Sequence, residues 1–505
     1  MPRFLRFEHV SFAYPGMDAP LLEDVDAFFP EGAWTGIVGA NGTGKTTLLR
    51  LAAGELSPTR GRVHSLGTAR YALQRTDDPP PDFAAFAASP DPDALEWRNR
   101  LGVAPDWPSR WPTLSHGERK RAQIAAALWQ NPGVLALDEP TNHLDAPAKA
   151  VLLRALRAYR GAGLLVSHDR AFLDALCAQC LFLFPPRATM RPGGVTQGLA
   201  EDRREQAAAR EKDTAARDAA HRLRESSQRR RELADQTAAR HKAAKNRKPP
   251  AHDHDGKAKR QLAHLTGKDA WAVSQSAALA RRAGKLEASR RALSPRKEYE
   301  MGFWLEGSGP SPRNAVLDAP AARIPLGDGR TLDLPPLRVG PLDHIALVGP
   351  NGIGKSTLLR HLLPLANVPP ERLLSVPQEI DADESRRILA AAKALPKDAL
   401  GRVMTSVSRL SSRPSRLLSA DCPSPGEIRK LLLALGVDRG PHLVVMDEPT
   451  NHLDLPSIEC LEDALADCPC AMILVSHDEP FLSRLSTSRW RLAPSSPATV
   501  SLQIT

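Results

Sequence analysis

Two stretches of the chain carry the same residue types at nearly the same spacing, and these types suit chemistry on a phosphate group. The first stretch contains the glycine-rich run GANGTGKTT at 39–47, the acidic run DEPTNHLD at 138–145 and VSHD at 166–169. The second repeats them in the same order, as GPNGIGKST at 349–357, DEPTNHLD at 447–454 and VSHD at 475–478. A loop that surrounds phosphate, a carboxylate pair and a histidine are the parts that hydrolysis of a nucleoside triphosphate needs. The repetition predicts a duplicated domain.

The glycine-rich run predicts a phosphate-binding loop. The apolar stretch from Ala33 to Gly39 is typical of a strand that feeds a loop, and a helix is expected from Lys45. Glycines let such a loop turn tightly, so that backbone N–H groups and the helix N-terminus surround the β-phosphate. Lysine then supplies a charge to the β and γ oxygens, and the following hydroxyl coordinates magnesium. The expected ATP contacts are Gly39, Asn41, Gly42, Gly44, Lys45, Thr46 and Thr47, and in the second copy Gly349, Asn351, Gly352, Gly354, Lys355, Ser356 and Thr357.

Each Asp-Glu pair follows an apolar run of four residues, VLAL in one copy and LVVM in the other. The aspartate at the end of such a strand can hold the shell of a magnesium ion, and the glutamate can orient and polarise the attacking water. The histidine of VSHD ends a further apolar strand and can contact the γ-phosphate. Capping of a strand is the alternative role for a buried Asp-Glu pair. The predicted catalytic residues are Glu139, Glu448, His168 and His477, and Asp138 and Asp447 are predicted metal ligands, with Thr46 and Ser356.

Three further residues are candidates for the nucleotide site. Gln74 and Gln378 lie between the glycine-rich loop and the next motif of each copy, and we expect them to contact the metal or the water. Either could instead be a surface glutamine. Tyr14, in FAYPG, is placed to stack on adenine, and the second copy has no obvious aromatic equivalent.

Length and composition limit the class of protein. A chain of 505 residues, 42% hydrophobic and 25% charged, is long enough for two or three cores. No apolar run approaches the ~18 to 20 residues of a membrane helix, and the first residues lack the apolar core of a secretory signal, so we expect a cytoplasmic protein without a membrane segment. The six cysteines, including a single CxxC at 177–180, suggest buried or free thiols. No metal beyond the nucleotide's Mg²⁺ is implied.

All of the excess positive charge lies in the middle of the chain. The net charge is +10, and residues 201–300 hold 26 Lys and Arg against 15 Asp and Glu. The composition favours helices from Leu199 to about Lys245 and from about Lys257 to Leu293. Apolar residues keep a seven-residue step only briefly, which favours a short antiparallel hairpin over a long coiled coil. Its tip is expected near residues 240–262.

Two interpretations of this hairpin compete. A charged, alanine-rich helix is often only a solvated spacer. The tip favours RNA, because RHKAAKNRK at 240–248 has six basic residues and no acidic one, and such a density attracts a phosphate backbone. Five histidines in the segment suggest metal binding less strongly, since no cysteine is near. The candidate RNA contacts are Arg240, Lys242, Lys245, Arg247, Lys248, Lys257, Lys259 and Arg260.

Taken together, the two sets of motifs resemble ATP-binding cassette domains. The resemblance includes a signature motif in each copy, LSHGE at 114–118 and PSPGE at 423–427. It implies that two cassettes pair head to tail, with each ATP between one phosphate loop and the other signature. The signature residues expected at the nucleotide are Ser115, Gly117, Glu118, Ser424, Gly426 and Glu427.

The signatures also depart from the family pattern. His116 replaces a glycine in one copy, and Pro423 and Pro425 replace leucine and that glycine in the other. Both sites are expected to bind ATP. Hydrolysis should be slower where Lys45 would face the proline-containing signature.

Two such cassettes joined by a basic linker are similar to the ABC-F family of translation factors and ribosome-protection proteins. The predicted fold is α/β, with P-loop cassettes at 1–195 and 305–505 joined by a helical hairpin at 196–304. The resemblance implies a monomer with an intramolecular cassette dimer that binds the ribosomal E site in its ATP-closed form. The linker would reach toward P-site tRNA and the peptidyl-transferase centre, so ribosomal RNA and tRNA are the expected partners, and DNA is not.

A different class of protein shares every cassette motif. The fused ATPase subunit of a membrane transporter is the alternative, although it has no use for a basic hairpin between its domains. Within the ABC-F family, the choice between a housekeeping translation factor and an antibiotic-resistance protein stays open.

Overall fold

The computed structural model describes residues 4–16, 19–65, 67–72, 75–142, 144–245, 268–293, 304, 308–327, 329–410, 412, 414–419, 423–451 and 453–505. The chain divides into two compact units. One comprises Met1–Gly198 together with Tyr299–Thr505 and contains both cassettes; the other is Leu199–Glu298. The predicted linker, 196–304, is thus slightly longer than this second unit.

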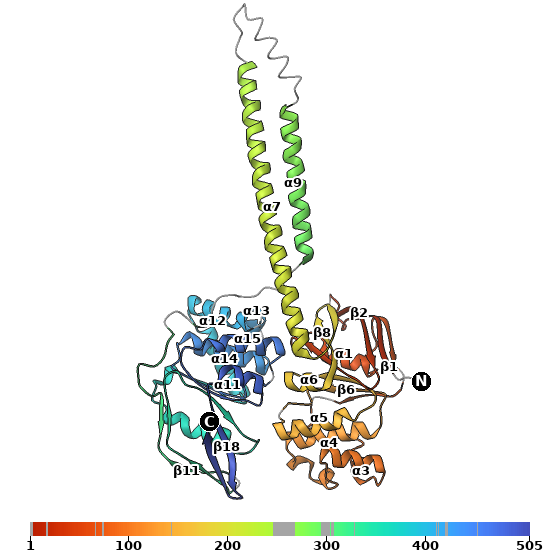
Figure 1. The fold of residues 1–505 in the computed structure, drawn as a ribbon, viewed down its shortest axis with the longest axis vertical. Helices are drawn as coiled ribbons and strands as arrows, with labels where there is room; N and C mark the ends of the chain where they lie inside the picture. The colour runs from red at the N-terminus through yellow and green to blue at the C-terminus, as the bar shows by residue number, and fades with distance from the viewer. Residues whose placement is uncertain are drawn as a thin grey trace, which may run out of the picture. The chain divides into compact units, whose positions relative to one another are not determined.

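The first cassette is built on a six-stranded sheet in the order β5-β6-β7-β3-β8-β9 (Figure 1). All neighbours are parallel except β8 and β9. Its inner strands are continuous apolar runs, as expected where both faces of a parallel sheet are covered. The strands are β3 (Trp34–Gly39), β5 (Ala69–Ala72), β6 (Val134–Asp138), β7 (Ala162–Val166), β8 (Cys177–Phe184) and β9 (Arg187–Pro192).

A second, antiparallel sheet holds helix α1 (Lys45–Ala52) in place. It has the order β2-β1-β4, with bounds Leu22–Pro30, Phe4–Phe12 and Arg60–Ser65. Leu48 and Leu49 of α1 share one buried core with Phe7 and Phe29 of this sheet and with Leu164 of β7. Because α1 is packed between the two sheets, the loop that precedes it is anchored at both ends.

The first cassette contains further helices besides α1. Aromatic pairs join three of them: Phe83 lies 5.3 Å from Trp111, and Phe86 lies 5.7 Å from Trp129, between ring centroids. These helices are α2 (Phe83–Ala88), α3 (Pro92–Leu101), the 3₁₀ helix η1 (Trp107–Thr113), α4 (His116–Trp129), α5 (Ala146–Arg157) and α6 (Arg170–Leu176).

The second cassette repeats the arrangement within an eight-stranded sheet of order β11-β12-β19-β18-β14-β17-β16-β15. The bounds are β11 (Ala322–Pro325), β12 (Thr331–Leu334), β14 (His344–Val348), β15 (Leu373–Val376), β16 (Leu443–Asp447), β17 (Ala471–Val475), β18 (Ser488–Ser496) and β19 (Thr499–Ile504). A small sheet pairs β10 (Leu317–Ala319) with β13 (Leu337–Val339). The order β15-β16-β17-β14-β18 matches β5-β6-β7-β3-β8 of the first cassette, as a duplication requires.

The helices of the second cassette form a similar set. Side chains of α11, α12, α13 and α14 build a core of their own, which includes Ile388, Val403, Leu417 and Leu431. The helices are α10 (Lys355–Leu362), η2 (Leu363–Leu365), η3 (Pro370–Arg372), α11 (Ala382–Lys393), α12 (Lys397–Arg409), α13 (Pro414–Ser419), α14 (Pro425–Asp438), α15 (Leu455–Ala466) and α16 (Glu479–Leu485).

Strand order explains why distant motifs meet. The strand that ends in Asp-Glu is paired in parallel with the strand that ends in VSH, and Asp138 is in register with Val166. That strand in turn pairs with β3, where Ile37 is in register with Val166. The carboxyl ends of all three strands therefore lie at one edge of the sheet, where α/β proteins commonly bind ligands.

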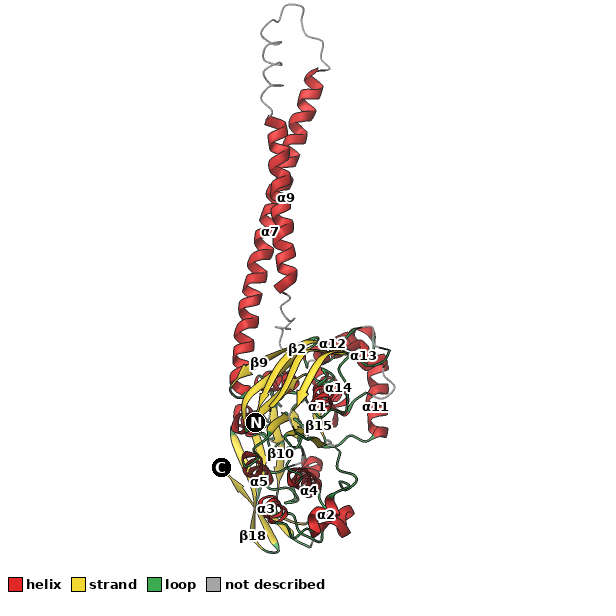
Figure 2. Cartoon of the chain, turned by 90° about the vertical axis from the view of Figure 1, so that its right-hand side faces the viewer, coloured by secondary structure: helices red, strands yellow, loops and turns green. Residues whose placement is uncertain are grey.

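Helices α7 (Val195–Lys245, 51 residues) and α9 (Lys268–Leu293, 26 residues) run side by side in Figures 1 and 2. Residues further along α7 contact residues earlier in α9: Arg290 lies 2.7 Å from Asp213, and the hydroxyls of Ser227 and Ser276 are 3.1 Å apart. Helices α7 and α9 therefore form an antiparallel pair. Residues 246–267, which include most of the predicted tip, lie outside the described residues.

Small side chains line the contact between these two helices. Ala220, Ala234 and Ala283 are buried, and Ser227 donates from its hydroxyl to the Ser276 carbonyl oxygen at 2.9 Å. Although α7 is long, no helix among the described residues is both long and apolar enough to span a membrane.

Candidate functional site

The two glycine-rich loops adopt the same strained backbone. Gly42 and Gly44 have φ of 77° and 95°, and Gly352 and Gly354 have φ of 72° and 109°. These values lie in the left-handed region, which only glycine enters at little cost. Space is also limited at this position, because a Cβ on Gly44 would lie 3.1 Å from the Leu21 side chain.

The lysine of each loop is buried at the start of its helix. Each donates to two carbonyl oxygens of its own loop: Lys45 Nζ to Gly39 and Ala40 at 2.8 and 3.1 Å, and Lys355 Nζ to Gly349 and Pro350 at 2.7 and 3.2 Å. Burial lowers the pKa of both lysines, whereas the neighbouring carboxylates, led by Glu139 for Lys45 and Glu448 for Lys355, act to raise it.

The next residue of each loop contacts the aspartate of the acidic pair. Thr46 Oγ1 donates to Asp138 Oδ2 at 2.8 Å, and Ser356 Oγ donates to Asp447 Oδ2 at 2.7 Å. Burial raises the pKa of both aspartates, and the hydroxyl hydrogen bonds oppose that shift. Adjacent hydroxyl and carboxylate oxygens are hard donors of the kind that Mg²⁺ prefers, so these residues fit the magnesium of a nucleotide.

The glutamates that follow are held in an unusual conformation. Glu139 and Glu448 both have φ of 48°, although neither is glycine, and both are buried. Their N–H groups donate to Val166 and Val475 carbonyl oxygens at 2.9 and 2.8 Å, which fixes each glutamate against the neighbouring strand. Such a conformation costs about 1–3 kcal/mol and is concentrated at functional sites.

The glutamate and histidine of each site differ between the cassettes. His168 Nε2 lies 3.0 Å from Glu139 Oε1, and His477 Nε2 lies 3.4 Å from Glu448 Oε1. Burial acts to raise the pKa of Glu139, but His168 and Lys45 outweigh it and the net shift is downward. Burial raises the pKa of Glu448 to about 7 against the charge of Lys355. Burial and the same lysine lower the pKa of His477 to about 4, which leaves it neutral at pH 7.

Each phosphate loop opens on a cavity large enough for part of a nucleotide. The first, of ≈ 440 Å³, contains Lys45, Glu139 and His168, together with Tyr14, whose hydroxyl lies 3.0 Å from Thr47 Oγ1. The second, of ≈ 410 Å³, contains the matching groups of the second cassette. It is also lined by residues of the first cassette: Thr141, Asn142, Leu144, Lys149, His168 and Asp169.

Aspartates at the end of the two DEPTNHLD runs reach across to the opposite phosphate loop. Asp454 Oδ2 accepts from the Asn41 N–H at 2.5 Å, and Asp145 Oδ2 accepts from the Asn351 N–H at 3.4 Å. The other oxygen of each caps a helix, by accepting from Ala148 N at 3.0 Å or Ser457 N at 2.9 Å. Each of the two carboxylates thus links the start of a helix in its own cassette to the phosphate loop of the other.

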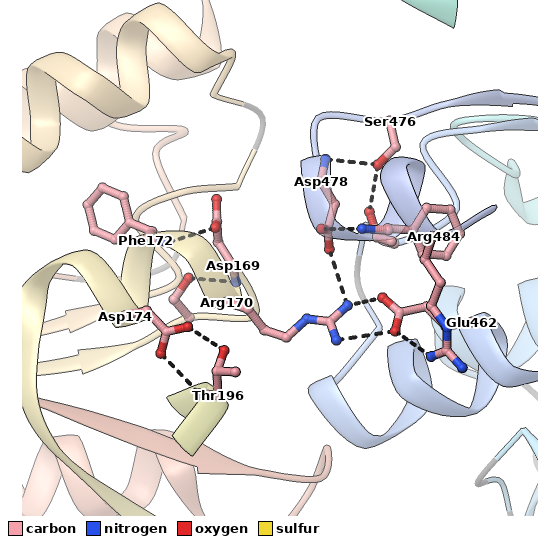
Figure 3. Close-up of polar contacts among 12 residues, drawn as sticks. Asp169, Arg170, Phe172, Asp174, Thr196, Glu462, Ser476, Asp478 and Arg484 are labelled. Atoms are coloured by element: carbon pink, nitrogen blue, oxygen red, sulfur yellow. Dashed lines mark hydrogen bonds and ion pairs between the residues drawn. The ribbon is translucent and has the colours of Figure 1, made fainter. Parts of the chain in front are cut away.

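One ion pair between the cassettes is not repeated at the corresponding position of the other copy. Figure 3 shows Arg170, at the start of α6, extended toward Glu462 of α15. Its Nη1 donates to Glu462 Oε2 at 3.2 Å, and Asp478 Oδ2 lies 4.0 Å from its Nη2. Arg484 donates to the same Glu462 oxygen at 3.2 Å. Glu479 stands where Arg170 would recur, directly after VSHD, and binds Arg489 of its own cassette at 2.9 Å.

Comparison with known proteins agrees with this geometry. A family model described as ABC transporter matches residues 22–142 and 336–451. The ATP-binding protein Uup of Caulobacter vibrioides is 29% identical over 498 residues, which cover 93% of this chain and 74% of Uup. The energy-dependent translational throttle protein EttA of Escherichia coli is 26% identical, with coverage of 92% and 88%. The ribosome protection protein VmlR of Bacillus subtilis is also 26% identical, with coverage of 94% and 85%.

The chain contains two ATP-binding cassette domains, and its relatives Uup, EttA and VmlR are proteins of the ABC-F family. It is therefore an ATP hydrolase. Solved structures show the same fold: the RNase-L inhibitor has a TM-score of 0.63 at 19% identity, covering 98% of this chain and 90% of that one. A model of ribosome-bound archaeal Pelota and ABCE1 contains a chain with a TM-score of 0.62 at 17% identity, with coverage of 98% and 78%.

The signature motifs of both cassettes begin helices. Ser115 caps α4 and Ser424 caps α14, and each accepts at Oγ from the N–H three residues later, at 3.3 Å. Glu118 and Glu427 accept in return from the serine N–H, at 2.8 and 3.0 Å, which completes two capping boxes. The two glutamates thus stabilise helix starts, and their predicted nucleotide contacts stay predictions.

Signature residues are absent from the linings of the two phosphate-loop cavities in the described part of the chain. A Cβ on Gly117 would lie 2.9 Å from Leu144 Cδ2, so the Leu144 side chain would have to move to admit it. Pro425 is the first residue of α14, where a missing N–H costs no helical hydrogen bond. Pro425 therefore does not weaken α14. The slower hydrolysis expected at this site would have to come from the part of the motif that faces the nucleotide.

Several other predicted residues can be placed. Gln378 lines the second cavity, and its carbonyl oxygen accepts from Arg429 at 2.5 Å. Gln74 lies outside the described residues, as do Arg247, Lys248, Lys257, Lys259 and Arg260. Arg240, Lys242 and Lys245 belong to α7, but their side chains are outside the description.

Sequence reasoning missed the residues that follow the acidic pairs. Thr141 and Asn142 line the second cavity, and their counterparts Thr450 and Asn451 line it from the other cassette. It also missed buried Lys120, which contributes positive charge near the first acidic pair and whose pKa burial lowers to about 8. The exact repetition of TNHLD in both cassettes could have identified the threonines and asparagines. No sequence pattern pointed to Lys120.

The first prediction concerns Glu448 in the nucleotide-free protein. Its folded pKa of about 7 exceeds the ordinary value of 4.5, so the folded state retains a proton that the unfolded state loses. Stability is therefore lost as the pH rises from 4.5 through 7, by about 3 kcal/mol at completion. Glu448→Gln should raise the thermal midpoint at pH 8 and have little effect at pH 5. Glu139→Gln is the matched control and should give no gain at pH 8. Parallel pH profiles for the two variants would contradict this account.

The second prediction concerns the Arg170–Glu462 pair. Among the described residues, Glu462→Leu leaves Asp478 at 4.0 Å as the acidic neighbour of the Arg170 guanidinium, which is 13% exposed, so the change should cost about 3 kcal/mol. Arg170→Met should cost about 1 kcal/mol, because Arg484 still neutralises Glu462. Thermal unfolding measures both, and Glu479→Gln is the control because its side chain is 63% exposed. Equal effects for the two variants would exclude the sharing of Glu462 by two arginines.

Proposed function

We propose that this ABC-F ATPase binds the ribosome at its E site in an ATP-closed form, and acts on P-site tRNA and the peptidyl-transferase centre through the hairpin of α7 and α9. It serves either as a translation factor or as a protein that protects ribosomes from an antibiotic. In this proposal the two cassettes form an intramolecular dimer, the protein acts as a monomer, and it works in the cytoplasm.

The two reciprocal aspartate contacts carry the proposal of paired cassettes. Asp145 and Asp454 each cap a helix in one cassette and accept from the phosphate loop of the other. A nucleotide that fills one loop must therefore affect the helix that begins in the opposite cassette. Closure on ATP would bring Ser424 and Gly426 to the site of Lys45, and Ser115 and Gly117 to the site of Lys355.

Within each site the residues have separable roles in ATP hydrolysis. The glycine-rich loop and its lysine bind the phosphates, and Thr46 or Ser356, with Asp138 or Asp447, would hold Mg²⁺, which neutralises phosphate charge when bound. Glu139 and Glu448 are fixed beside the loops and positioned to accept a proton from the attacking water. A pKa of about 7 for Glu448 suits a base that works near neutral pH.

The ribosomal part of the proposal draws on the relatives and on charge. EttA is named a translational throttle protein and VmlR a ribosome protection protein, and both align along most of this chain. The segment 201–300 holds 26 basic against 15 acidic residues. A transporter ATPase subunit remains the alternative. Sedimentation of the ATP-bound protein with ribosomes supports the proposal, whereas sedimentation only with membranes supports the transporter.

The third prediction concerns the two glutamates together. Glu139→Gln with Glu448→Gln should keep ATP binding and slow hydrolysis by roughly 10² to 10⁴ fold, since the interactions with phosphate survive without the base. Retained ATP should then stabilise the ribosome-bound form, as measured by co-sedimentation. Glu96→Gln, at an exposed pair with Arg100, is the control. Near-normal hydrolysis by the double variant would remove both glutamates from the mechanism.

The fourth prediction concerns the basic residues expected at the tip. Replacing Arg240, Lys242, Lys245, Arg247 and Lys248 with Gln should weaken ribosome binding by the ATP-trapped protein and leave nucleotide binding unchanged. The salt dependence should flatten by a slope of about 0.7 to 0.9 for each RNA phosphate that the tip no longer neutralises. Arg222, Arg229 and Arg231, exposed along α7, provide a control set for a general reduction of positive charge. A wild-type salt slope in the tip variant, with full activity in cells, would make the tip a spacer.

A further inference from the structure

Lys149 lies in a nucleotide cavity that belongs to the other cassette. It is on α5 of the first cassette, four residues after Asp145, whose carboxylate contacts the second phosphate loop at Asn351. The ≈ 410 Å³ cavity that Lys149 lines also contains Lys355, Glu448 and His477. The N-terminal turn of α5 thus brings a cation from one half of the chain to the phosphate loop of the other.

A single carboxylate at the cavity wall holds this lysine. Lys149 Nζ lies 2.7 Å from Asp169 Oδ2, and the two side chains are 19% and 17% exposed. Asp169 is itself fixed, because its other oxygen accepts from the Phe172 N–H at 2.9 Å and caps α6. An ammonium group carries three donors, so this pairing alone does not use its full capacity. The flexible stem also lets the charge move within the cavity.

The first nucleotide site receives no such cation from the corresponding position. Ile458 stands four residues after Asp454, as Lys149 stands four residues after Asp145. Asp478, the counterpart of Asp169, faces Arg170 at 4.0 Å instead. The charge of Lys149 also acts on its neighbours in the second site. After burial and Lys355, its charge is a further cause that lowers the pKa of His477.

We propose that Lys149 is supplied by the first cassette to the second nucleotide site, where its ammonium exchanges Asp169 for the terminal phosphate oxygens of a nucleoside triphosphate. The proposal rests on nucleotide binding between paired cassettes. A diphosphate ends one phosphate earlier and carries less negative charge, so Lys149 favours the triphosphate at this site. The first site, for which Ile458 stands at the corresponding sequence position, receives no such cation and discriminates less by this route.

Binding of a slowly hydrolysed ATP analogue and of ADP tests the proposal. Measurements use the full chain with Lys45→Ala, which leaves the second site as the main nucleotide site, and report the ratio of the two Kd values by calorimetry. Lys149→Met should lower the preference for the triphosphate by about tenfold, as expected when one charge-assisted hydrogen bond is removed. Lys149→Arg should keep the ratio within about threefold of the parent, because the charge is retained.

Two further variants separate phosphate binding from a structural role. Asp169→Asn still caps α6 but releases Lys149, so it should raise the preference for the triphosphate. Ile458→Met, the matched control in the same cavity, should leave the ratio unchanged.

The proposal is overturned if Lys149→Met keeps the parent ratio within about twofold, if Asp169→Asn lowers the ratio as Lys149→Met does, or if Ile458→Met lowers it equally. Failure of the Lys45→Ala parent to bind either nucleotide would refute the second site and the proposal with it. Ribosomes are absent from the assay, so an error in the proposed ribosomal role leaves this result unaffected.

Discussion

Buried carboxylates at the ends of β6 and β16 are the constraint on which the rest of the structure depends. Asp138, Glu139, Asp447 and Glu448 are between 3% and 7% exposed. A charge in such a place is costly unless neighbouring groups compensate it. The compensating groups come from the phosphate loop, which adds a lysine and a hydroxyl, and from the adjacent strand, which adds a histidine. The pairing of the three strands and the apolar packing of α1 between two sheets bring these groups together.

The two cassettes compensate their buried carboxylates to different extents. Glu139 pairs with His168 at 3.0 Å, whereas Glu448 lies 3.4 Å from a histidine that is neutral at pH 7. The second site receives positive charge from Lys149 of the other half, and the first has Tyr14 near its loop. The two sites therefore share a backbone, down to a φ of 48° at each glutamate, but differ in the charge around the reacting groups.

Sequence patterns predicted the fold, and they identified the loop, the acidic pair and the histidine that the structure brings together in each cassette, because those groups belong to motifs of fixed spacing. The hairpin helix was predicted to begin at Leu199, whereas α7 begins four residues earlier, at Val195, and is described as far as Lys245. Contacts between the halves escaped prediction. Asn41 and Asp454 are 413 positions apart, and nothing in either run specifies which helix start faces which loop. The roles of Glu118 and Glu427 were also missed, since a helix cap and a ligand contact draw on the same residue types.

Arg484 gives the contact between the cassettes a property that the pair of Arg170 and Glu462 would lack by itself. Glu462 is almost fully buried, so withdrawal of Arg170 from a simple pair would strand a carboxylate away from water. Here a second guanidinium, from the same cassette as Glu462, is already bonded to it at 3.2 Å and would stay. The carboxylate therefore has a second counter-ion. Separation of Arg170 from Glu462 would therefore leave the carboxylate paired within its own cassette, so the cost of breaking this contact falls mainly on Arg170.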